Sequence, residues 1–497
     1  MLQLLILHAI AALVAPVLVG WIGRRAFLVL AAVPASAAAW AALNTGAALS
    51  GEPPSQTLLW VGGLGMHLQF RLDALSWLMT LIVGGMGALV LVYSAAYFAK
   101  GASALGRFAA VFLAFAGAML GLVTADNTLL LYVFWELTTI SSYVLIGHYH
   151  ERQASRRAAS QAIMVTTLGG LAMLAGLVLL AGSTGGSSTI SVLVERARTG
   201  ELGAGDAAFL VPTAIVLVLA GAVTKSALLP FHFWLPAAMA APTPVSAYLH
   251  AAAMVKAGVY LVARLAPGFG EHGSWRTMVL TLGLGTLLLG GYRALRQHDL
   301  KLLLAFGTVS QLGMMIAMVG YGTRAAALAG LAMIAAHSMF KASLFLVVGI
   351  IDWSVGTRDM RELSGLGRSM PVVAAAGTLA TASMIGLPPF AGYVAKEAAL
   401  EALAHDGDWL VLGILATGSA LTVAYGLRFL AGAFGTKQGV ARSRCRYQSR
   451  LIAVSPVVLA LAGLAAGLVP AALENALAPH ADAHPGAAGH LVLWGGF

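Results

Sequence analysis

Residues 217–236 read "LVLAGAVTKSALLPFHFWLP". This apolar run carries Lys225 in its body, and Pro230 interrupts it five residues later. A proline removes a helical hydrogen-bond donor and clashes with the preceding turn, so the run predicts a broken helix. A lysine at the centre of a bilayer costs about 2.5 to 3.5 kcal/mol if it faces lipid, so we expect Lys225 to face protein or water.

The composition of the whole chain places this run in a membrane protein. Of the 497 residues, 59% are hydrophobic and only 10% are charged. A soluble core cannot absorb that much apolar surface, so the class is an all-α protein that crosses the membrane many times. The single cysteine, Cys445, excludes an internal disulfide and a multi-cysteine metal site. No phosphate-binding loop, dinucleotide fingerprint or nucleophile elbow is present, and we expect no cofactor and no metal.

The basic residues indicate how the chain is oriented. The formal net charge is +10, but the lysines and arginines are scattered through short connectors, which argues against nucleic-acid binding. About 14 apolar runs could span a bilayer, and eighteen basic residues follow odd-numbered runs whereas six follow even-numbered ones. The positive-inside rule therefore puts the odd-numbered connectors in the cytoplasm and both termini outside. The runs begin near Leu2, Ala26, Asp73, Phe108, Asn127, Ala158, Ala208, Val245, Met278, Leu300, Ala325, Val372, Trp409 and Leu451.

A second break suggests an internal repeat. Run 12 contains "GLPPFAGYVAKEAAL" (386–400), in which Pro388 and Pro389 interrupt an apolar stretch as Pro230 does in run 7. A unit of five helices re-enters the membrane upside down when repeated, so runs 4–8 and 9–13 are predicted to form two inverted five-helix repeats. The expected divisions are N-terminal helices 1–3 (1–107), a first repeat (108–266), an inverted second repeat (267–436), and a basic connector with helix 14 and an extracellular tail (437–497).

Ionisable residues within the predicted spans are the candidates for function. Glu136 lies about nine residues into run 5, in "LLLYVFWELTTISSYVLIG". Such a carboxylate could be locked to a lysine to hold helices together, but ionisable groups inside membranes usually mark an ion path. A buried lysine holds its proton more tightly when a carboxylate is near, so a lysine that gains and loses Glu136 could act as a switch. The sequence leaves open whether Lys225 or Lys256 is that partner.

Two histidine–lysine pairs extend this set. His250 and Lys256 in run 8 are six residues apart, which puts them about 240° apart around a continuous helix. His337 and Lys341 in run 11 are four apart and share one face. Histidine titrates nearest physiological pH and suits a proton relay. Lys396 follows the second break and is expected to correspond to Lys225 in its own repeat.

These segments resemble the antiporter-like family shared by the large membrane subunits of respiratory complex I and the Mrp-type multi-subunit cation/proton antiporters. The resemblance rests on "FWELTTISSYVLIG", "FHFWLP", "DLKLLLAFGTVSQLGMM", "AAHSMFKASLFLVVG" and "GLPPFAGYVAKEAAL", and it covers nearly the whole chain. The first two segments are most similar to the Mrp A subunit. The chain departs from the family pattern at Ala237 and Ala240, where relatives commonly carry acidic residues.

The resemblance implies roles for the charged residues. It makes Glu136 and Lys225 the charged pair, Lys396 the terminal proton-transfer lysine, and His250, Lys256 and His337 the central relay. Lys341 remains a relay candidate because it shares a helix face with His337. It also draws in His232 and Lys301, which the charge pattern alone treats as connector residues. It implies a secondary antiporter subunit, not an enzyme, in a bacterial cell membrane, with other Mrp-type subunits as partners and H⁺ and Na⁺ (or Li⁺ or K⁺) as cargo.

Two other functions remain open at this stage. The chain could be a proton-translocating subunit of a complex I-like redox pump, driven by quinone chemistry in other subunits. It could also be the membrane subunit of an inorganic-carbon uptake complex. A scaffold without transport is disfavoured, because it gives no reason to keep four lysines inside the membrane.

The charge pattern makes a testable prediction about orientation. Reporter fusions in the connectors near Arg156 and Arg361 should report a cytoplasmic location, and a fusion near Arg198 should report the outside, because basic connectors are retained in the cytoplasm. Paired phosphatase and fluorescent-protein fusions at each position measure this directly. Finding Arg198 and Arg361 on the same side would contradict the inverted-repeat arrangement.

Overall fold

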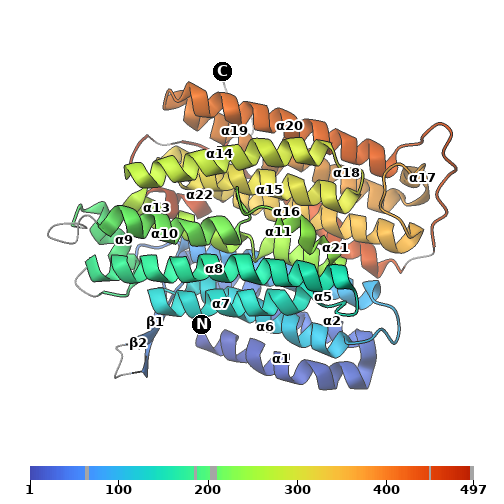
Figure 1. The fold of residues 1–497 in the computed structure, drawn as a ribbon, viewed down its shortest axis with the longest axis horizontal. Coiled ribbons are helices and arrows are strands. Elements are labelled where there is room, and N and C mark those ends of the chain that lie inside the picture. Colours follow the sequence, from blue (N-terminus) through green and yellow to red (C-terminus); the bar gives the residue numbers. More distant parts are fainter. Residues whose placement is uncertain (62–65, 184–186, 202–209, 447–448, 488, 493–497) are drawn as a thin grey trace.

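The chain folds into a bundle of roughly parallel and antiparallel helices, with one small hairpin at its edge (Figure 1). The computed structural model describes residues 1–61, 66–183, 187–201, 210–446, 449–487 and 489–492. The predicted start of run 7 at Ala208 and the last five residues of the chain lie outside them. The all-α membrane class that the composition predicts is confirmed, since eleven helices of the described residues are long and apolar enough to cross a bilayer.

The first part of the chain contains the only strands among the described residues. An antiparallel hairpin pairs Ser55 with Arg71 and Leu58 with Leu68, and the sequence analysis did not predict it. The elements of this part are α1 (Leu2–Ile22), α2 (Ala26–Leu30), α3 (Ala32–Leu43), α4 (Thr45–Ala48), β1 (Ser55–Val61), β2 (Met66–Arg71), α5 (Ala74–Tyr97), α6 (Leu105–Thr124), α7 (Thr128–Ile146) and α8 (Gln153–Ser183).

The remaining elements are helical, and several are short. They are α9 (Ile190–Arg198), α10 (Leu210–Lys225), α11 (Trp234–Ala237), α12 (Thr243–Ala247), a π-helical turn η4 (Tyr248–Ala252), α13 (Lys256–Phe269), α14 (Gly273–Leu295), α15 (Leu300–Val319), α16 (Arg324–Val355), α17 (Leu366–Ser369), α18 (Pro371–Ile385), α19 (Ala391–His405), α20 (Trp409–Phe434), α21 (Leu451–Leu468) and α22 (Pro470–Ala481), with short 3₁₀ turns at Gly23–Arg25 and Ala238–Ala240.

Each predicted apolar run falls on one of these helices. The first candidate span, Leu2–Leu43, covers the first two runs, and runs 7 and 12 fall on the shorter apolar helices Leu210–Lys225 and Pro371–Ile385. The count of 14 crossings and the inverted repeats stay predictions, as do the four divisions of the chain.

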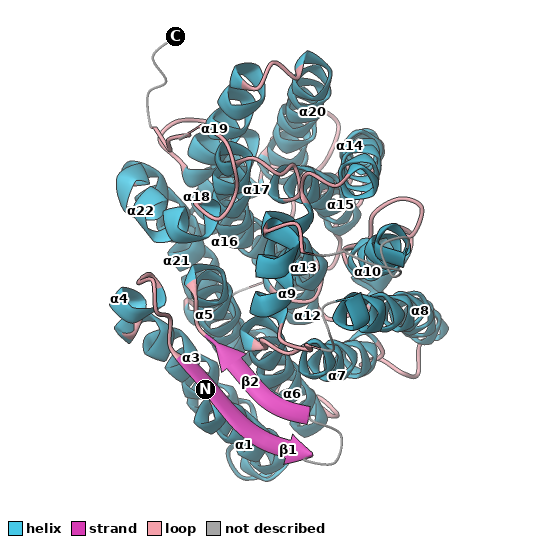
Figure 2. Cartoon of the chain, turned by 90° about the vertical axis from the view of Figure 1, so that its left-hand side faces the viewer, coloured by secondary structure: helices cyan, strands magenta, loops and turns pink. Residues whose placement is uncertain are grey.

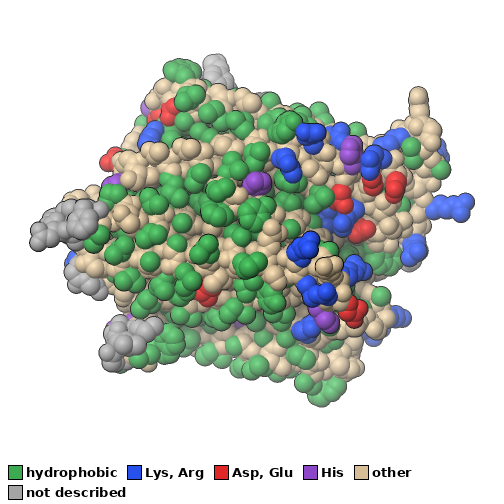
Figure 3. Space-filling model, in the orientation of Figure 1, with side chains coloured by type: hydrophobic (Ala, Val, Ile, Leu, Met, Phe, Trp, Pro, Cys, Tyr) green, Lys and Arg blue, Asp and Glu red, His purple; other side chains and the backbone are tan. Residues whose placement is uncertain are grey.

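Basic connectors gather at one end of the bundle. On the face shown in Figure 3, lysines and arginines crowd the right-hand end, whereas apolar side chains cover the middle. Connectors that follow odd-numbered runs bond to one another there. Arg107 donates to the carbonyl of His148 at 3.1 Å, and Arg358 pairs with Asp299 at 2.5 Å.

The even-numbered connectors meet at the opposite end, together with Leu2 near the start of the chain and Gly489 near its end. Arg276 pairs with Asp408 at 3.4 Å across two such connectors. The backbone N–H of Leu2 donates to Gln56 of β1, and Arg324 donates to the carbonyl of Gly489. Figure 2 looks onto this end, where the hairpin and α9 lie. Leu2 and Gly489 therefore lie at the same end of the bundle, and the location of both termini outside the cytoplasm stays a prediction.

The helices of runs 7 and 12 are broken near their prolines, as predicted. Run 8 is also broken, which corrects the sequence analysis. α10 ends at Lys225, and α18 ends at Ile385 before Gly386, which has a φ of +86°. In run 8, a π turn and a non-helical link at residues 253–255 separate His250 from Lys256. The angle of about 240° predicted for a continuous helix therefore does not apply.

The helices that carry most candidate residues form the centre of the bundle. The most apolar windows of Thr243–Phe269, Leu300–Val319 and Arg324–Val355 are 100%, 94% and 94% buried, against 17% for Leu2–Leu43. A helix that is apolar all round belongs inside a bundle. Lys256, Lys301, His337 and Lys341 are therefore held on elements that other helices largely cover.

Glycine allows a close helix crossing between α14 and α15. A Cβ added at Gly313 would overlap the backbone of Gly283 and lie 2.7 Å from the amide nitrogen of Leu287. We expect Gly313→Val to separate the two helices and lower the melting temperature of the purified protein, because overpacking costs about 1–3 kcal/mol.

The matched control for this crossing is Gly413→Val. Gly413 also lies within a long helix, α20, but an added Cβ there meets nothing within 4 Å. The control should melt within a degree or so of the wild type, since surface substitutions usually change stability by about 0.5 kcal/mol or less. Equal melting temperatures for the two variants would show that the crossing does not limit stability.

Candidate functional site

Lys225 is fully buried at the end of α10 and reaches across to α7. Its ammonium donates to the carbonyl of Trp135 at 3.0 Å and to the hydroxyl of Thr139 at 2.7 Å. It also lies 5.0 Å from the centre of the Trp135 ring, a distance at which a cation and an aromatic face attract each other. The lysine of the opening stretch is therefore held by neutral groups.

Glu136 sits between these two partners of Lys225 in sequence, on the same helix. Its carboxylate lies against Gly170 of α8, where a Cβ would collide with it. The buried oxygen Oε1 has no hydrogen-bond partner among the described residues. Glu136 interacts electrostatically with Lys225, which favours Lys225 over Lys256 as its partner, but the two do not form an ion pair within 4.0 Å.

Lys256 occupies the break in run 8. Its ammonium donates to the carbonyl of Ala251, in the π turn, and to the hydroxyl of Ser338 on α16. A π turn shifts the regular hydrogen-bond pattern and leaves carbonyls available to other donors. The lysine thereby joins the broken run 8 to the central helix α16.

His250 lies in the π turn that precedes Lys256, and His337 lies next to Ser338, which accepts from Lys256. Both are fully buried, and neither ring nitrogen of either residue has a hydrogen-bond partner among the described residues. The His250 ring lies 6.3 Å from that of Trp234, whose indole nitrogen donates to the carbonyl of Thr224, next to Lys225. Buried polar atoms normally bond to protein or to ordered water, so the two histidines mark places where water can join the chain of groups.

Lys341 lies one turn beyond His337 on α16, as its spacing predicts. Its ammonium is 3.4 Å from the carbonyl of Leu304 and 5.6 Å from the centre of the Tyr425 ring. Gln311 lies nearby on α15 and donates to Thr422 at 3.1 Å, while the oxygen Oε1 of Gln311 and the hydroxyl of Tyr425 have no partner among the described residues. Buried polar atoms without a hydrogen-bond partner are therefore present around Lys341 as well as around Lys225.

Lys396 binds the end of a broken helix, but its position differs from that of Lys225. It lies six residues into α19, after the break, and donates to the carbonyl of Met384 near the end of α18 at 2.9 Å. Lys225 instead ends the helix before its break. The predicted correspondence is therefore wrong in detail. What the two lysines share is proximity to a helix end, where carbonyls lack helical partners.

Lys301 is not a connector residue, which corrects the charge-based view. It is the second residue of α15, only 1% exposed, and donates to the carbonyls of Met239 and Ala241 beyond the first break at 2.9 and 2.6 Å. His232 lies in the break itself, and its Nδ1 has no partner among the described residues. Pro230 lies in the same break, and Pro388 and Pro389 lie in the second one.

One property unites the buried lysines. Their exposed fractions lie between 0% and 6%, yet none of them is within 4.0 Å of a carboxylate in the described part of the chain. Backbone carbonyls and hydroxyls accept from them instead. An ammonium held by neutral acceptors gives up its proton without stranding a partner charge, whereas a lysine locked in an ion pair does not.

Sequence reasoning missed the neutral groups that complete this set. Thr139 lies three residues after Glu136, and Ser338 directly follows His337, so their spacing from charged residues was a usable signal. Gln311, Thr422 and Tyr425 come from two other helices and carried no such signal.

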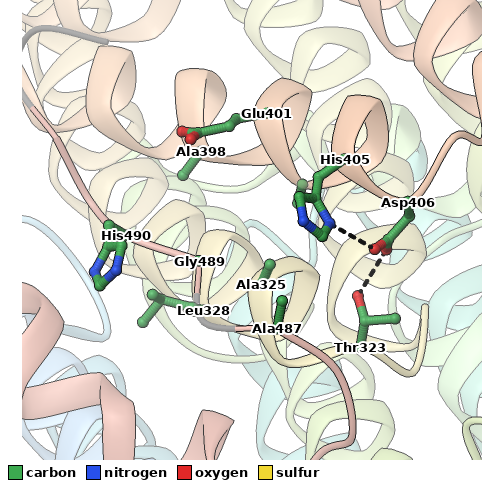
Figure 4. Close-up of a pocket in the computed structure, with 11 residues that line it drawn as sticks. Thr323, Ala325, Leu328, Ala398, Glu401, His405, Asp406, Ala487, Gly489 and His490 are labelled. Atoms are coloured by element: carbon green, nitrogen blue, oxygen red, sulfur yellow. Dashed lines mark hydrogen bonds and ion pairs between the residues drawn. The ribbon is translucent and has the colours of Figure 1, made fainter. Parts of the chain in front are cut away.

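The candidate residues from Glu136 and Lys225 through Lys256 and Lys341 to Lys396 form what we call the row, and the hollow drawn in Figure 4 lies away from it. This hollow lies at the end of α19, where Asp406 accepts from Thr323 at 3.1 Å and pairs with His405 at 3.7 Å. None of the predicted relay residues lines it. Within the described residues, no group of three or more His, Cys, Asp or Glu side chains is placed to hold a metal ion.

Solved structures share this fold. The Mrp complex from Dietzia sp. aligns with a TM-score of 0.88 and 37% identity over 100% of this chain and 53% of the matching one. The membrane-bound sulfane sulfur reductase, an archaeal respiratory membrane complex, aligns at 0.84 and 22% identity, over 97% of this chain and 96% of the other. Respiratory complex I from Thermus thermophilus aligns at 0.82 and 24% identity, over 97% and 98%. The last two show the fold alone.

Sequence comparison is more specific. The Na(+)/H(+) antiporter subunit A1 of Staphylococcus aureus is 40% identical over 456 residues, which cover 86% of this chain and 56% of the relative. The chain thus spans about half the length of the curated relatives it matches. Residues 59–109 match the model for the N-terminus of chain 5 of NADH-ubiquinone oxidoreductase (complex I). Residues 125–422, which hold every buried lysine described above, match the transmembrane model shared by NADH:quinone oxidoreductases and Mrp antiporters, and the chain belongs to that family.

Proposed function

We propose that this chain is a membrane subunit of a multi-subunit cation/proton antiporter of the bacterial cell membrane. In this proposal, proton influx through the buried row of residues drives the efflux of Na⁺, Li⁺ or K⁺. The observation that carries it is the set of buried lysines held by neutral acceptors, because a structural role for these charges would favour ion pairs. Both termini lie outside the cytoplasm in this proposal, since the basic connectors lie at the opposite end.

The relatives favour antiport over a redox pump. The 40% identical relative is named as an antiporter subunit, and the 37% identical structure is an Mrp complex. Complex I shares 24% identity and supports only the fold. The site itself offers ionisable and hydroxyl groups for proton transfer, so transport rather than enzymatic chemistry is what its residues can perform.

The proton step begins where Lys225 can change partners. Its present acceptors are the carbonyl of Trp135 and the hydroxyl of Thr139, and the Glu136 carboxylate lies between them in sequence. A small movement of the ammonium would exchange neutral acceptors for a carboxylate. Because a nearby carboxylate stabilises a charged lysine, that movement alternates between tight and loose proton binding.

The rest of the row can carry the proton onward. After Lys225, the proton reaches His250, which lies next to Trp234. It then passes through Lys256 and Ser338 to His337 and Lys341. Lys396 is the last group. Each group accepts and releases a proton or orients water that does so. His232 and Lys301 lie beside the first break and, in this proposal, connect the row to the end with the basic connectors.

Partner subunits follow from the exposure of Glu136 in the isolated chain. The carboxylate is half-buried, and Leu137 and Ile140 on the same helix are 43% and 53% exposed. An ionised side chain facing lipid is costly, so another polypeptide is expected to cover this part of α7. We propose other Mrp-type subunits as these partners.

The central test is Lys225→Arg. Arginine keeps the positive charge but does not release its proton at any working pH. We expect the variant to assemble normally and to exchange at least about tenfold more slowly, because a positioned proton-transfer group contributes about 10²–10⁴-fold. The measurement is cation-dependent proton flux in inverted membrane vesicles from cells without native antiporters.

The matched control is Lys437→Arg. Lys437 also donates to several backbone carbonyls, among them that of Leu363, but it lies in the connector after α20 and outside the row. It should exchange at the wild-type rate. Full exchange by Lys225→Arg would show that Lys225 does not carry the proton.

A second test concerns partners and the driving force. The chain expressed alone should give little or no exchange, and co-expression with the neighbouring gene products should restore it without a respiratory electron donor. A requirement for the donor would favour the redox pump instead. Robust exchange by the purified single chain in liposomes would contradict the need for partners.

A further inference from the structure

A hollow of about 690 Å³ opens at the end of the bundle that carries the even-numbered connectors. It lies between α9, α13 and α22, and its lining includes Arg71, Asp73, Arg264 and His480. We call it the vestibule. Figure 2 views the molecule from this end. None of the residues in the proposed proton row lines it. Its inner end, which we call the floor, is formed by Arg264 and Asp73.

The floor of the vestibule is one connected hydrogen-bond network. Arg264 forms a two-point ion pair with Asp73, the N-cap of α5, and its Nη2 also donates to the hydroxyl of Ser76 at 2.7 Å. Its Nε donates to the hydroxyl of Tyr260 at 3.2 Å. Burial disfavours the charged form of Asp73, but Arg264 holds the pKa of that carboxyl well below its usual range. The pair is therefore ionised and closes the inner end of the vestibule in the conformation described.

Behind this ion pair, a polar stripe leads to the proton row. Lys256, Tyr260 and Arg264 are spaced four residues apart on α13, so they share one face and neighbouring Cβ atoms lie about 5–6 Å apart. Lys256 belongs to the row, and Arg264 lines the vestibule. Tyr260 is fully buried between them.

Polar residues also lie on α5, which Arg264 of α13 contacts at Ser76. Ser76, which touches Arg264, is followed one turn deeper by Thr80, about 6 Å further into the membrane. Thr80 is fully buried, and its hydroxyl has no partner among the described residues. Further along the same face, the carbonyl of Val83 accepts from Tyr248 in the π turn of run 8. Polar contacts on α5 thus extend inward from Ser76 beside the vestibule to the π turn that precedes Lys256.

We infer that Tyr260 carries protons between Lys256 and the vestibule, and that the Arg264–Asp73 pair gates this branch in the conformation described. The inference rests on the proposed function and assigns it a side branch to the end opposite the basic connectors. The Tyr260 oxygen accepts from Arg264, so its own proton is free to point elsewhere. In a transfer step the oxygen takes one proton from the Lys256 side and releases its own to water in the vestibule, and it ends neutral.

The lining explains why the cargo of this branch is the proton. The lining holds four arginines (Arg71, Arg196, Arg198 and Arg264) against two carboxylates (Asp73 and Glu195), so positive charge is in excess. Glu195 pairs with Arg198 at 2.8 Å, Asp73 pairs with Arg264, and Arg196 pairs with Glu201 at 3.9 Å. Burial and then the neighbouring His484 and Arg264 lower the pKa of His480 to about 3, so this histidine adds no charge. A positively charged mouth repels metal cations, whereas protons pass by exchange along hydrogen bonds.

The first experiment removes a single hydroxyl. Tyr260→Phe keeps the ring and its packing, and we expect proton-coupled exchange by the complex in liposomes to fall at least tenfold with unchanged assembly. Tyr93→Phe is the control, because Tyr93 is equally buried and loses one hydrogen bond, to the carbonyl of Leu346. Wild-type exchange by an assembled Tyr260→Phe complex would overturn the inference while leaving the proposed function intact. A wild-type complex that fails to exchange would instead refute the proposed function.

The second experiment tests access without relying on transport. In a background in which Cys445 is replaced by Ser, a thiol at Ser76→Cys should react with a membrane-impermeant reagent added from the vestibule side, although Ser76 is 1% exposed in the closed state. Ser50→Cys, on the exposed rim, should react from the same side without affecting exchange. Labelling of Ser76→Cys should block exchange, and a thiol there that never reacts would show that the gate does not open.

Discussion

Every part of the site follows from the difficulty of placing an ammonium group inside a membrane. A lysine there needs acceptors, and carboxylates would hold its proton too firmly for transfer. The chain supplies backbone carbonyls instead, and carbonyls become available where helices are interrupted. Lys256 takes one from the π turn, Lys396 takes one from the end of α18, and Lys301 takes two from beyond the first break. The broken helices thus supply acceptors to three of the lysines, whereas Lys225 and Lys341 contact the carbonyls of Trp135 and Leu304 within regular helices.

The same constraint determines where the site lies in the bundle. Interrupted backbone is tolerated in a membrane only where protein or water covers it. The broken run 8 is the most buried of the candidate spans, and α15 and α16 enclose it. Long unbroken helices such as α1 and α8 expose apolar side chains at the outside. The bundle is therefore arranged as a shell of regular helices around a core of irregular ones.

The structure contains two kinds of buried charge, which differ in their partners. Arg264 and Asp73 form the kind of two-point, hydrogen-bonded pair that stays closed unless something displaces it. The lysines of the row have neutral partners only. A protein that transfers protons needs both kinds of contact. Neutral acceptors let a lysine release its proton, and a closed ion pair prevents protons from crossing the membrane by an uncoupled path. The vestibule beside Arg264 shows where such control would act.

The sequence by itself determined the membrane class, the helices, the two proline breaks and most of the charged residues of the site. The length of an apolar run, a helix-breaking proline and a charge within a membrane span are local signals, so they can be recognised in one sequence. The pair His337 and Lys341 was placed correctly because four residues make one turn of a regular helix. The hairpin at 55–71 was missed, because two short strands give a weak pattern.

Tertiary structure decided which groups meet. Run 8 reads as a continuous helix, and only its packing against α16 shows the π turn that separates His250 from Lys256. Lys301 reads as a connector residue in the sequence, whereas in the structure its ammonium donates to two carbonyls some sixty residues away. Thr139, Gln311 and Tyr425 are ordinary residues in sequence. Their roles arise from distances between helices, and those distances depend on close packing at glycines such as Gly170 and Gly313, which no local pattern specifies.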